Sequence, residues 1–178
     1  MKRFSTILLM LMLIVVFGCQ EASETPPMGS AAKMIDYAAI KAQLAREQQQ
    51  YADAWCNQDM NAIGEIWSHD DDITIWNADP RARIQGWEGP NGVKALYQNS
   101  FDSMETIDFK ISDVLVKVAK SGTAAVVTYY VENDFVDNDG KKGKGTPRVT
   151  VVRELIDGKW KTIHGDASFS ISEIKAMK

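Results

Sequence analysis

The chain has 178 residues, which is enough for one domain with short extensions. Its hydrophobic content of 45% and charged content of 25% are ordinary for a globular protein. The net charge of -4 comes without a basic cluster, which argues against a nucleic acid as partner. The sequence carries no glycine-rich phosphate loop, serine nucleophile elbow or zinc-ligand spacing, so we expect neither a cofactor nor a metal site.

The first residues have the pattern of an export signal. Met1-Lys2-Arg3 is basic, and the apolar run from Ile7 to Phe17 is too short for a typical membrane span. The run ends in Val16-Phe17-Gly18-Cys19, which resembles a bacterial lipobox, where cleavage precedes a lipidated cysteine. We therefore expect a lipoprotein signal peptide at residues 1–18 and lipidation of Cys19; a plain signal peptide and an uncleaved anchor are the alternatives.

Residues 19–32 follow as a lipidated N-terminus and a flexible tether rich in Ser, Thr, Pro and Gly. Gln20 stands where an aspartate would resemble an inner-membrane retention signal, so the resemblance implies the outer membrane, facing the periplasm. Membrane contact is then expected only through the lipid anchor. Cleavage removes Lys2 and Arg3, which takes Lys plus Arg from 20 to 18 against 24 Asp plus Glu, a net charge of -6.

Hydrophobic periodicity divides the domain, residues 33–178, into helices followed by long strands. The spacing of Tyr51, Trp55 and their apolar neighbours predicts a first helix, and Asp59 is a good N-cap for a second. The predicted helices cover 31–57, a short stretch from 59, and a stretch after 86–89. The predicted strands cover 73–76, 81–85, 107–119, 123–136, 146–156 and 159–171, with a polar loop at 137–145. This order is an α+β pattern, in which a strongly curved, mostly antiparallel sheet can enclose the helices as a cone with an internal pocket.

The last predicted strand carries the most informative run. Asp157-Gly158 is a strong hairpin signal, and the residues after it alternate. The alternation places five residues on one face: Trp160, Thr162, His164, Asp166 and Ser168. An aromatic ring, an imidazole, a carboxylate and hydroxyls on one face predict the wall of a pocket, and the alternative is the solvent face of the sheet.

Asp166 and His164 are the candidate catalytic residues. They are two positions apart, about 7 Å between Cα atoms, so both side chains can reach one ligand and transfer a proton. The alternative is a structural hydrogen bond that orients the imidazole. The other expected pocket residues are Trp160, Thr162, Ser168, Trp67 and Trp76. Tyr97, Tyr129 and Tyr130 are candidate hydroxyl donors whose facing depends on strand register.

Two arginines of the penultimate strand complete the set of charged candidates. Arg148 and Arg153 are separated by an odd offset, so at most one can face the cavity, where it would pair with Asp166 or with an anionic ligand. The acidic run His69-Asp70-Asp71-Asp72 falls at a helix-to-strand junction, where consecutive side chains rarely converge on one ion. We interpret it as a connecting loop.

Several short sequence motifs, taken in their order along the chain, resemble those of a known family. The motifs are Ile66 to Thr74, Gln85 to Gly89, Arg148 to Arg153 and Asp157 to His164. In this order they resemble the SnoaL-like branch of the nuclear-transport-factor-two-like (NTF2-like) superfamily, the ketosteroid-isomerase-like cone fold. The resemblance implies a pocket open at one end and a homodimer packed through the sheet. Many relatives carry His-x-His-x-Ser in the last strand, and Asp166 replaces the second histidine here.

The resemblance implies little about chemistry, because members include steroid isomerases, cyclases, dehydratases and kinase association domains. Our leading hypothesis is an envelope-anchored domain that binds a small, largely apolar ligand, with or without catalysis. The first alternative is a proton-transfer enzyme that uses Asp166 and His164. The second alternative is a dimeric association module. The sequence does not identify the ligand.

Overall fold

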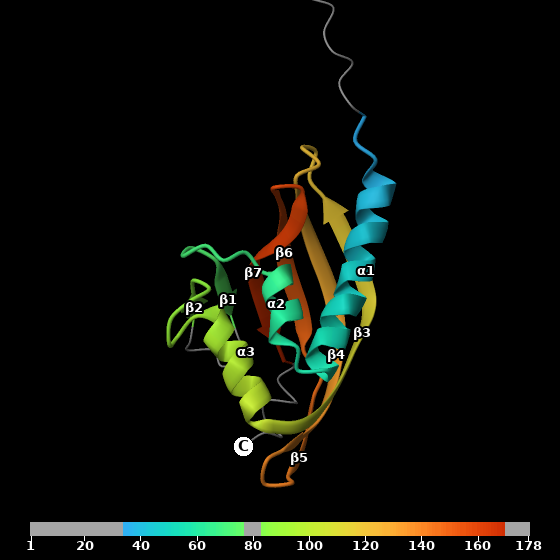
Figure 1. Cartoon of the computed structure of the whole chain (residues 1–178). Helices are drawn as coiled ribbons and strands as arrows, with labels where there is room; N and C mark the ends of the chain where they lie inside the picture. Colours follow the sequence, from blue (N-terminus) through green and yellow to red (C-terminus); the bar gives the residue numbers. More distant parts are fainter. Residues whose placement is uncertain (1–33, 77–82, 170–178) are drawn as a thin grey trace, which may run out of the picture. The chain divides into compact units, whose positions relative to one another are not determined.

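The computed structural model describes residues 34–76 and 83–169, and these residues form three helices and seven strands (Figure 1). The helices are α1 (Tyr37–Cys56), α2 (Met60–Ile66) and α3 (Val93–Asp102). The strands are β1 (Thr74–Trp76), β2 (Arg83–Gln85), β3 (Met104–Val118), β4 (Ala124–Asp137), β5 (Lys142–Gly145), β6 (Arg148–Ile156) and β7 (Lys159–Ser168). The α+β class predicted from the sequence is confirmed. The expected leader and tether lie outside the described residues.

The strands form one sheet in the order β2-β1-β7-β6-β4-β3, and β5 pairs with the end of β4. All pairs are antiparallel except β1 with β7, which is parallel. β5 corrects the prediction of a polar loop at 137–145. Its backbone pairs closely with β4 because Gly143 leaves room for Phe135, whose ring would stand 2.1 Å from a Cβ at that position.

The three helices lie on one face of the sheet, and β3 bends as it passes from the end of α3 to the side of α1 (Figure 1). Asp36 and Asp59 cap the first two helices: Asp36 Oδ1 accepts from the Ala39 amide, and Asp59 Oδ1 accepts from the amides of Asn61 and Ala62. Each carboxylate satisfies amides that the helix leaves unpaired at its start. None of the helices in the described part of the chain is both long and apolar enough to span a membrane.

A β-bulge interrupts the regular alternation of β7. Val152 pairs with His164 and Arg153 pairs with Thr162, so Ile163 has no opposite residue on β6. An extra residue of this kind reverses which side chains face the core from that point on. Before the bulge, Trp160 and Thr162 are the buried residues; after it, Gly165 is buried.

The predicted common face of β7 is therefore wrong. Trp160 and Thr162 do face the helices, but His164 and Ser168 belong to the opposite, outer face of the sheet, and Asp166, which alternates with them, reaches only the margin of the inner cavity. Their cross-strand partners on β6 are Val152, Thr150 and Arg148. The inner positions after the bulge are Gly165 and Ala167, small residues that leave space above the sheet.

Candidate functional site

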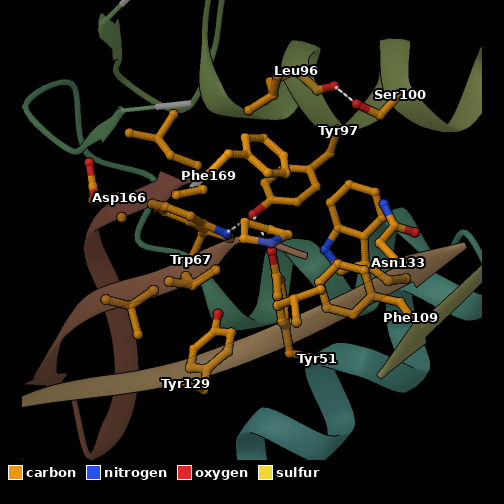
Figure 2. Close-up of a pocket in the computed structure, with 18 residues that line it drawn as sticks. Tyr51, Trp67, Leu96, Tyr97, Ser100, Phe109, Tyr129, Asn133, Asp166 and Phe169 are labelled. Carbon is orange, nitrogen blue, oxygen red and sulfur yellow. Dashed lines mark hydrogen bonds between the residues drawn. The ribbon is translucent and has the colours of Figure 1, made fainter. Parts of the chain in front are cut away.

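A cavity of about 180 Å³ lies between the helices and the inner face of the sheet (Figure 2). Small residues on β7 make room for it, and aromatic side chains supply most of its wall. The aromatic residues that line it are Tyr51, Trp55, Trp67, Tyr97, Phe109, Tyr129 and Phe169. An engineered apolar cavity of about 150 Å³ in another protein holds a benzene molecule, so this one has room for a small ring compound.

Two tyrosines and a tryptophan form a hydrogen-bonded chain in this wall (Figure 2). Tyr51 on α1 and Tyr97 on α3 share a hydrogen bond of 2.8 Å between their hydroxyl oxygens. Trp67, just after α2, donates from Nε1 to the Tyr97 hydroxyl over 3.1 Å. The three groups hold three protons and make two hydrogen bonds. Whichever tyrosine donates to the other, one hydroxyl proton has no acceptor within the described residues.

Burial keeps these hydroxyls in their neutral form. Desolvation raises the pKa of Tyr51, and the Tyr97 hydroxyl partly offsets that rise. Desolvation also raises the pKa of Tyr97 and of Tyr129 well above the ordinary value. The cavity therefore offers protonated hydroxyl donors at neutral pH, as a ligand with a carbonyl or hydroxyl oxygen requires.

Asn133 supplies a further polar atom to the cavity wall. Its Oδ1 is buried and has no hydrogen-bond partner within the described residues. A buried amide group without a partner is costly, so its presence in a cavity wall favours an occupant that hydrogen-bonds to it.

The expected pocket residues are divided between different places. Trp67 lines the main cavity, whereas Trp160 is buried at 5% exposure outside its lining. Thr162 lines a smaller hollow next to the cavity. Ser168 lines a groove on the outer face, and Trp76 is 42% exposed. The sequence did not decide which way Tyr97, Tyr129 and Tyr130 face. In the structure, Tyr97 and Tyr129 face the cavity and Tyr130 is 49% exposed.

His164 and Asp166 do not converge inside the cavity. His164 Nδ1 lies 2.7 Å from Thr74 Oγ1, a cross-strand contact between β7 and β1 on the outer face. Asp166 belongs to the cavity wall but lies at its margin, apart from Tyr51 and Tyr97 (Figure 2). The catalytic role of the pair stays a prediction, and the bulge in β7 removes the shared face on which we based it.

Sequence reasoning missed several residues of the site. Tyr51 and Trp55 are recognisable as members of an apolar helix face, but their contact with Tyr97 depends on how α1 and α3 pack. Tyr51 and Tyr97 are 46 positions apart, and no local spacing connects them. Asn133 lies in a strand of β-branched and aromatic residues. A polar residue at an inward-facing position of such a strand could have indicated a polar group in the cavity wall.

The two arginines of β6 face opposite sides, as the sequence predicted. Arg148 is exposed and lines the outer groove, and Arg153 is only 1% exposed on the inner side. Arg153 Nη2 donates to Glu47 Oε2 over 2.6 Å and to the Trp160 carbonyl over 2.7 Å. Burial lowers the pKa of Arg153, and the Glu47 carboxylate acts against that lowering. The inner arginine pairs with Glu47 and not with Asp166.

Residues 34–76 and 83–169 contain no group of three or more His, Cys, Asp or Glu side chains arranged to hold a metal ion.

A family model for the SnoaL-like domain matches residues 47–172. The match covers most of the chain and all of the cavity described above. The chain belongs to the SnoaL-like domain family. A comparison with curated proteins gives no match.

Solved structures with the same fold share little sequence with the chain. An NTF2-like superfamily protein from Salmonella enterica subsp. enterica serovar Typhimurium str. LT2 matches at 17% identity and TM-score 0.66, covering 74% of this chain and 92% of its own. A protein provisionally named a scytalone dehydratase, from Novosphingobium aromaticivorans DSM 12444, matches at 14% identity and TM-score 0.66, covering 78% and 89%. The association domain of CaMKII from C. elegans matches at 19% identity and TM-score 0.58, covering 74% and 96%. Likeness at this identity shows the fold alone.

Proposed function

We propose that the domain binds a small ring-shaped molecule with a hydrogen-bond acceptor, and that a lipid on Cys19 anchors it in the bacterial envelope. The observation that carries the binding proposal is the unpaired hydroxyl proton of the Tyr51–Tyr97 pair in an apolar cavity. Apolar walls with a few placed polar groups are typical of small-molecule sites. A donor without a partner in such a wall favours ligands that bring an acceptor.

The binding proposal is tested with two probes of similar shape, acetophenone and ethylbenzene. Saturation-transfer NMR on the full-length protein should detect both, and acetophenone should bind more tightly by about 5-fold to 10-fold, the worth of one net hydrogen bond. Tyr51→Phe combined with Tyr97→Phe should reduce that preference; any part that remains comes from the indole N–H groups of Trp55 and Trp67, which have no acceptor within the described residues of this variant. Equal binding of the two probes to the wild-type protein would contradict the role of the hydroxyl.

A pair of adjacent residues offers a matched control for the location. Ala167 faces the cavity, whereas Ser168 faces the outer groove. Ala167→Leu should fill part of the cavity and abolish binding of both probes, while Ser168→Leu places the same side chain on the other face and should leave binding intact. Loss of binding in both variants would mean that the probes bind elsewhere.

The envelope anchor is tested separately, because it rests on residues outside the described range. Cys19→Ser should move the protein from the membrane fraction of a producing bacterium to the soluble fraction. Retention of the variant in the membrane fraction would refute lipidation as the anchor and favour an uncleaved N-terminal segment.

Proton-transfer catalysis is a second candidate function. A neutral hydroxyl donor in a dry cavity is what an enzyme needs to stabilise an enolate oxygen, and two solved structures with this fold have names that assign them provisionally as dehydratases. Asp166 at the cavity margin is the candidate base, with His164 behind it on the outer face. An isomerase or dehydratase activity that survived Asp166→Asn together with His164→Ala would exclude these two residues as its acid and base.

A homodimer through the outer face of the sheet is the third part of the proposal. That face carries exposed apolar side chains, with Leu115 at 64%, Tyr130 at 49% and Val126 at 39% exposure. Exposed apolar groups gathered on one sheet favour a protein partner. Leu115→Glu with Val126→Glu should convert a dimer into a monomer in analytical ultracentrifugation, and a wild-type protein that sediments as a monomer would refute the dimer.

A further inference from the structure

A basic groove lies between the start of α1 and the turn from β3 to β4, which are at the same end of the domain (Figure 1). It has a volume of about 240 Å³ and is lined by Tyr37 and Val118 together with three exposed lysines. These groove lysines are Lys41 on α1, Lys117 on β3 and Lys120 in the turn that follows. The groove therefore gathers three positive charges in a chain whose net charge is negative.

The groove lysines have no carboxylate partner. Five other lysines lie within 3.9 Å of a carboxylate oxygen: Lys94, Lys110, Lys144, Lys159 and Lys161. None of the groove lysines has such a contact within residues 34–76 and 83–169. Lys141 and Lys142 also lack one in the described part of the chain, but they stand at the start of β5, at the opposite end of the domain (Figure 1). A lysine without a neighbouring carboxylate leaves its charge to attract anions outside the domain.

Contacts between α1 and the β3–β4 turn hold the groove in shape. The Tyr37 hydroxyl donates to the Lys120 carbonyl over 3.0 Å. The Ile35 side chain packs over Gly122, where a Cβ would stand 2.8 Å from Ile35 Cγ2. Gly122 also has a φ of +72°, which glycine adopts without strain. Ile35 and Tyr37 are themselves exposed, so apolar groups border the lysines.

The packing of Ile35 fixes where the N-terminal segment enters the domain. Fifteen residues separate Cys19 from Ile35, so a lipid on Cys19 lies at most about 55 Å from this point. The proposed anchor therefore joins the domain at its basic end. Asn133 of the ligand cavity lies about 30 Å from the start of β4, toward the other end of that strand.

Acidic residues on the neighbouring hairpin restrict which side of this end can meet an anionic surface. Leu155 donates its backbone N–H to the Thr123 carbonyl over 2.8 Å, so the β6–β7 hairpin lies beside the β3–β4 turn. That hairpin carries Glu154 and Asp157, and Asp36 caps the start of α1. An anionic surface repels the hairpin carboxylates and attracts the groove lysines, which favours contact through the side formed by α1 and β3.

We propose that the groove lysines dock this end of the domain on the anionic phospholipid surface of the membrane that carries the anchor. The inference rests on the proposed lipid on Cys19 and adds a second membrane contact to it. Each lysine near an anionic leaflet strengthens binding by about 5-fold, so three together favour the docked orientation by roughly 100-fold. The exposed ring of Tyr37 suits the boundary between headgroups and water. Docking sets the orientation of the domain and keeps the Asn133 end of the cavity away from the bilayer.

The test measures how fast each lysine is acetylated in the full-length, lipid-anchored protein. The protein is reconstituted in vesicles of phosphatidylethanolamine with about a quarter phosphatidylglycerol, or of phosphatidylcholine alone, and mass spectrometry reports each site at low reagent. On the anionic vesicles, acetylation of the groove lysines should be slower by about 3-fold or more, whereas Lys141 and Lys142 should change by less than about 1.5-fold. Salt at about 1 M should remove the difference, because it shortens the Debye length to about 3 Å.

A pair of double variants keeps Lys120 as the reporter. Lys41→Gln with Lys117→Gln weakens docking by about 25-fold and should abolish the protection of Lys120. Lys141→Gln with Lys142→Gln removes the same charge at the opposite end and should leave that protection intact. All four lysines are exposed, so both variants should fold and should bind acetophenone as the wild-type protein does.

Four results would overturn the inference. Equal acetylation of the groove lysines on anionic and neutral vesicles, in protein that stays with the vesicles, would refute docking and leave the anchor in place. Protection of Lys120 that survives Lys41→Gln with Lys117→Gln would show that the contact does not depend on the groove. Protection in isolated bacterial envelopes but not on lipid vesicles would assign the groove to an acidic protein partner. A protein that stays with neither kind of vesicle would refute the proposed anchor and the docking together.

Discussion

Replacing Tyr97 or Tyr51 by phenylalanine should have unequal effects on stability, because the two hydroxyls occupy different places in the hydrogen-bonded chain. Tyr97 is 2% exposed, and its oxygen receives the indole N–H of Trp67 and shares a hydrogen bond with Tyr51. Within the described residues, the Tyr51 hydroxyl makes one hydrogen bond, to Tyr97. The central hydroxyl therefore serves two partners and the terminal one serves one.

The free energies of unfolding follow from this count. Tyr51→Phe removes one hydrogen bond, worth about 0.5–1.5 kcal/mol, while the Tyr97 oxygen still accepts from Trp67. Tyr97→Phe removes the same bond and also leaves the buried Trp67 N–H without an acceptor, which costs about 1–3 kcal/mol more. Tyr97→Phe should thus be the more destabilising change by about 1–3 kcal/mol. The double variant should lose no more free energy of unfolding than the two single variants lose together, because both single changes remove the same hydrogen bond.

Urea unfolding of the full-length protein, followed by far-ultraviolet circular dichroism, measures these differences without relying on the tryptophans near the site. Trp67→Phe in the wild-type and Tyr97→Phe backgrounds is the internal control: both lose the same buried indole volume, so the change should cost less in the Tyr97→Phe background, where the N–H is already unpaired. Equal losses for Tyr51→Phe and Tyr97→Phe, or a larger loss for Tyr51→Phe, would refute the assignment of Tyr97 as the central acceptor.

Three other outcomes follow from the same contacts. The three buried tyrosines of the cavity have raised pKa values, so the unfolded chain loses phenolic protons first, and the free energy of unfolding should fall as pH rises above about 10; alkaline titration at 295 nm should show their ionisation only on unfolding. Asp59→Ala should destabilise by about 1 kcal/mol through loss of the α2 cap, measured by urea unfolding. Glu47→Gln leaves the Arg153 guanidinium uncompensated and should cost about 3 kcal/mol in the same assay, the lower end for a buried pair because the Glu47 side chain is 21% exposed.

Local chemistry was enough to predict most of the elements. Asp59 identifies the start of α2 because its carboxylate pairs with amides only two and three residues away. The strand β5 could not be predicted in this way, since Lys142–Gly145 has the composition of a turn and becomes a strand through pairing with β4. Its strand character comes from a partner outside the segment.

The site shows the same division between local and distant causes. The odd offset of Arg148 and Arg153 predicts that only one faces inward, because β6 is regular between them. The residue that pairs with the inner arginine is Glu47, on a helix 106 positions earlier, and no spacing rule reaches it.

The bulge at Ile163 explains why the most distinctive run of the sequence was assigned to the wrong face. Strict alternation in β7 would direct His164 and Asp166 toward Tyr97 and fill the space that Gly165 leaves open. A Cβ at Gly165 would lie 3.3 Å from both Ile75 and Trp67, so no larger residue at this position fits without displacing them. Because of this one inserted residue, the small residues Gly165 and Ala167 line the cavity in place of larger polar side chains. The insertion also leaves Thr162 facing inward, opposite Arg153 on β6. The bulge therefore determines which residues of β7 line the cavity.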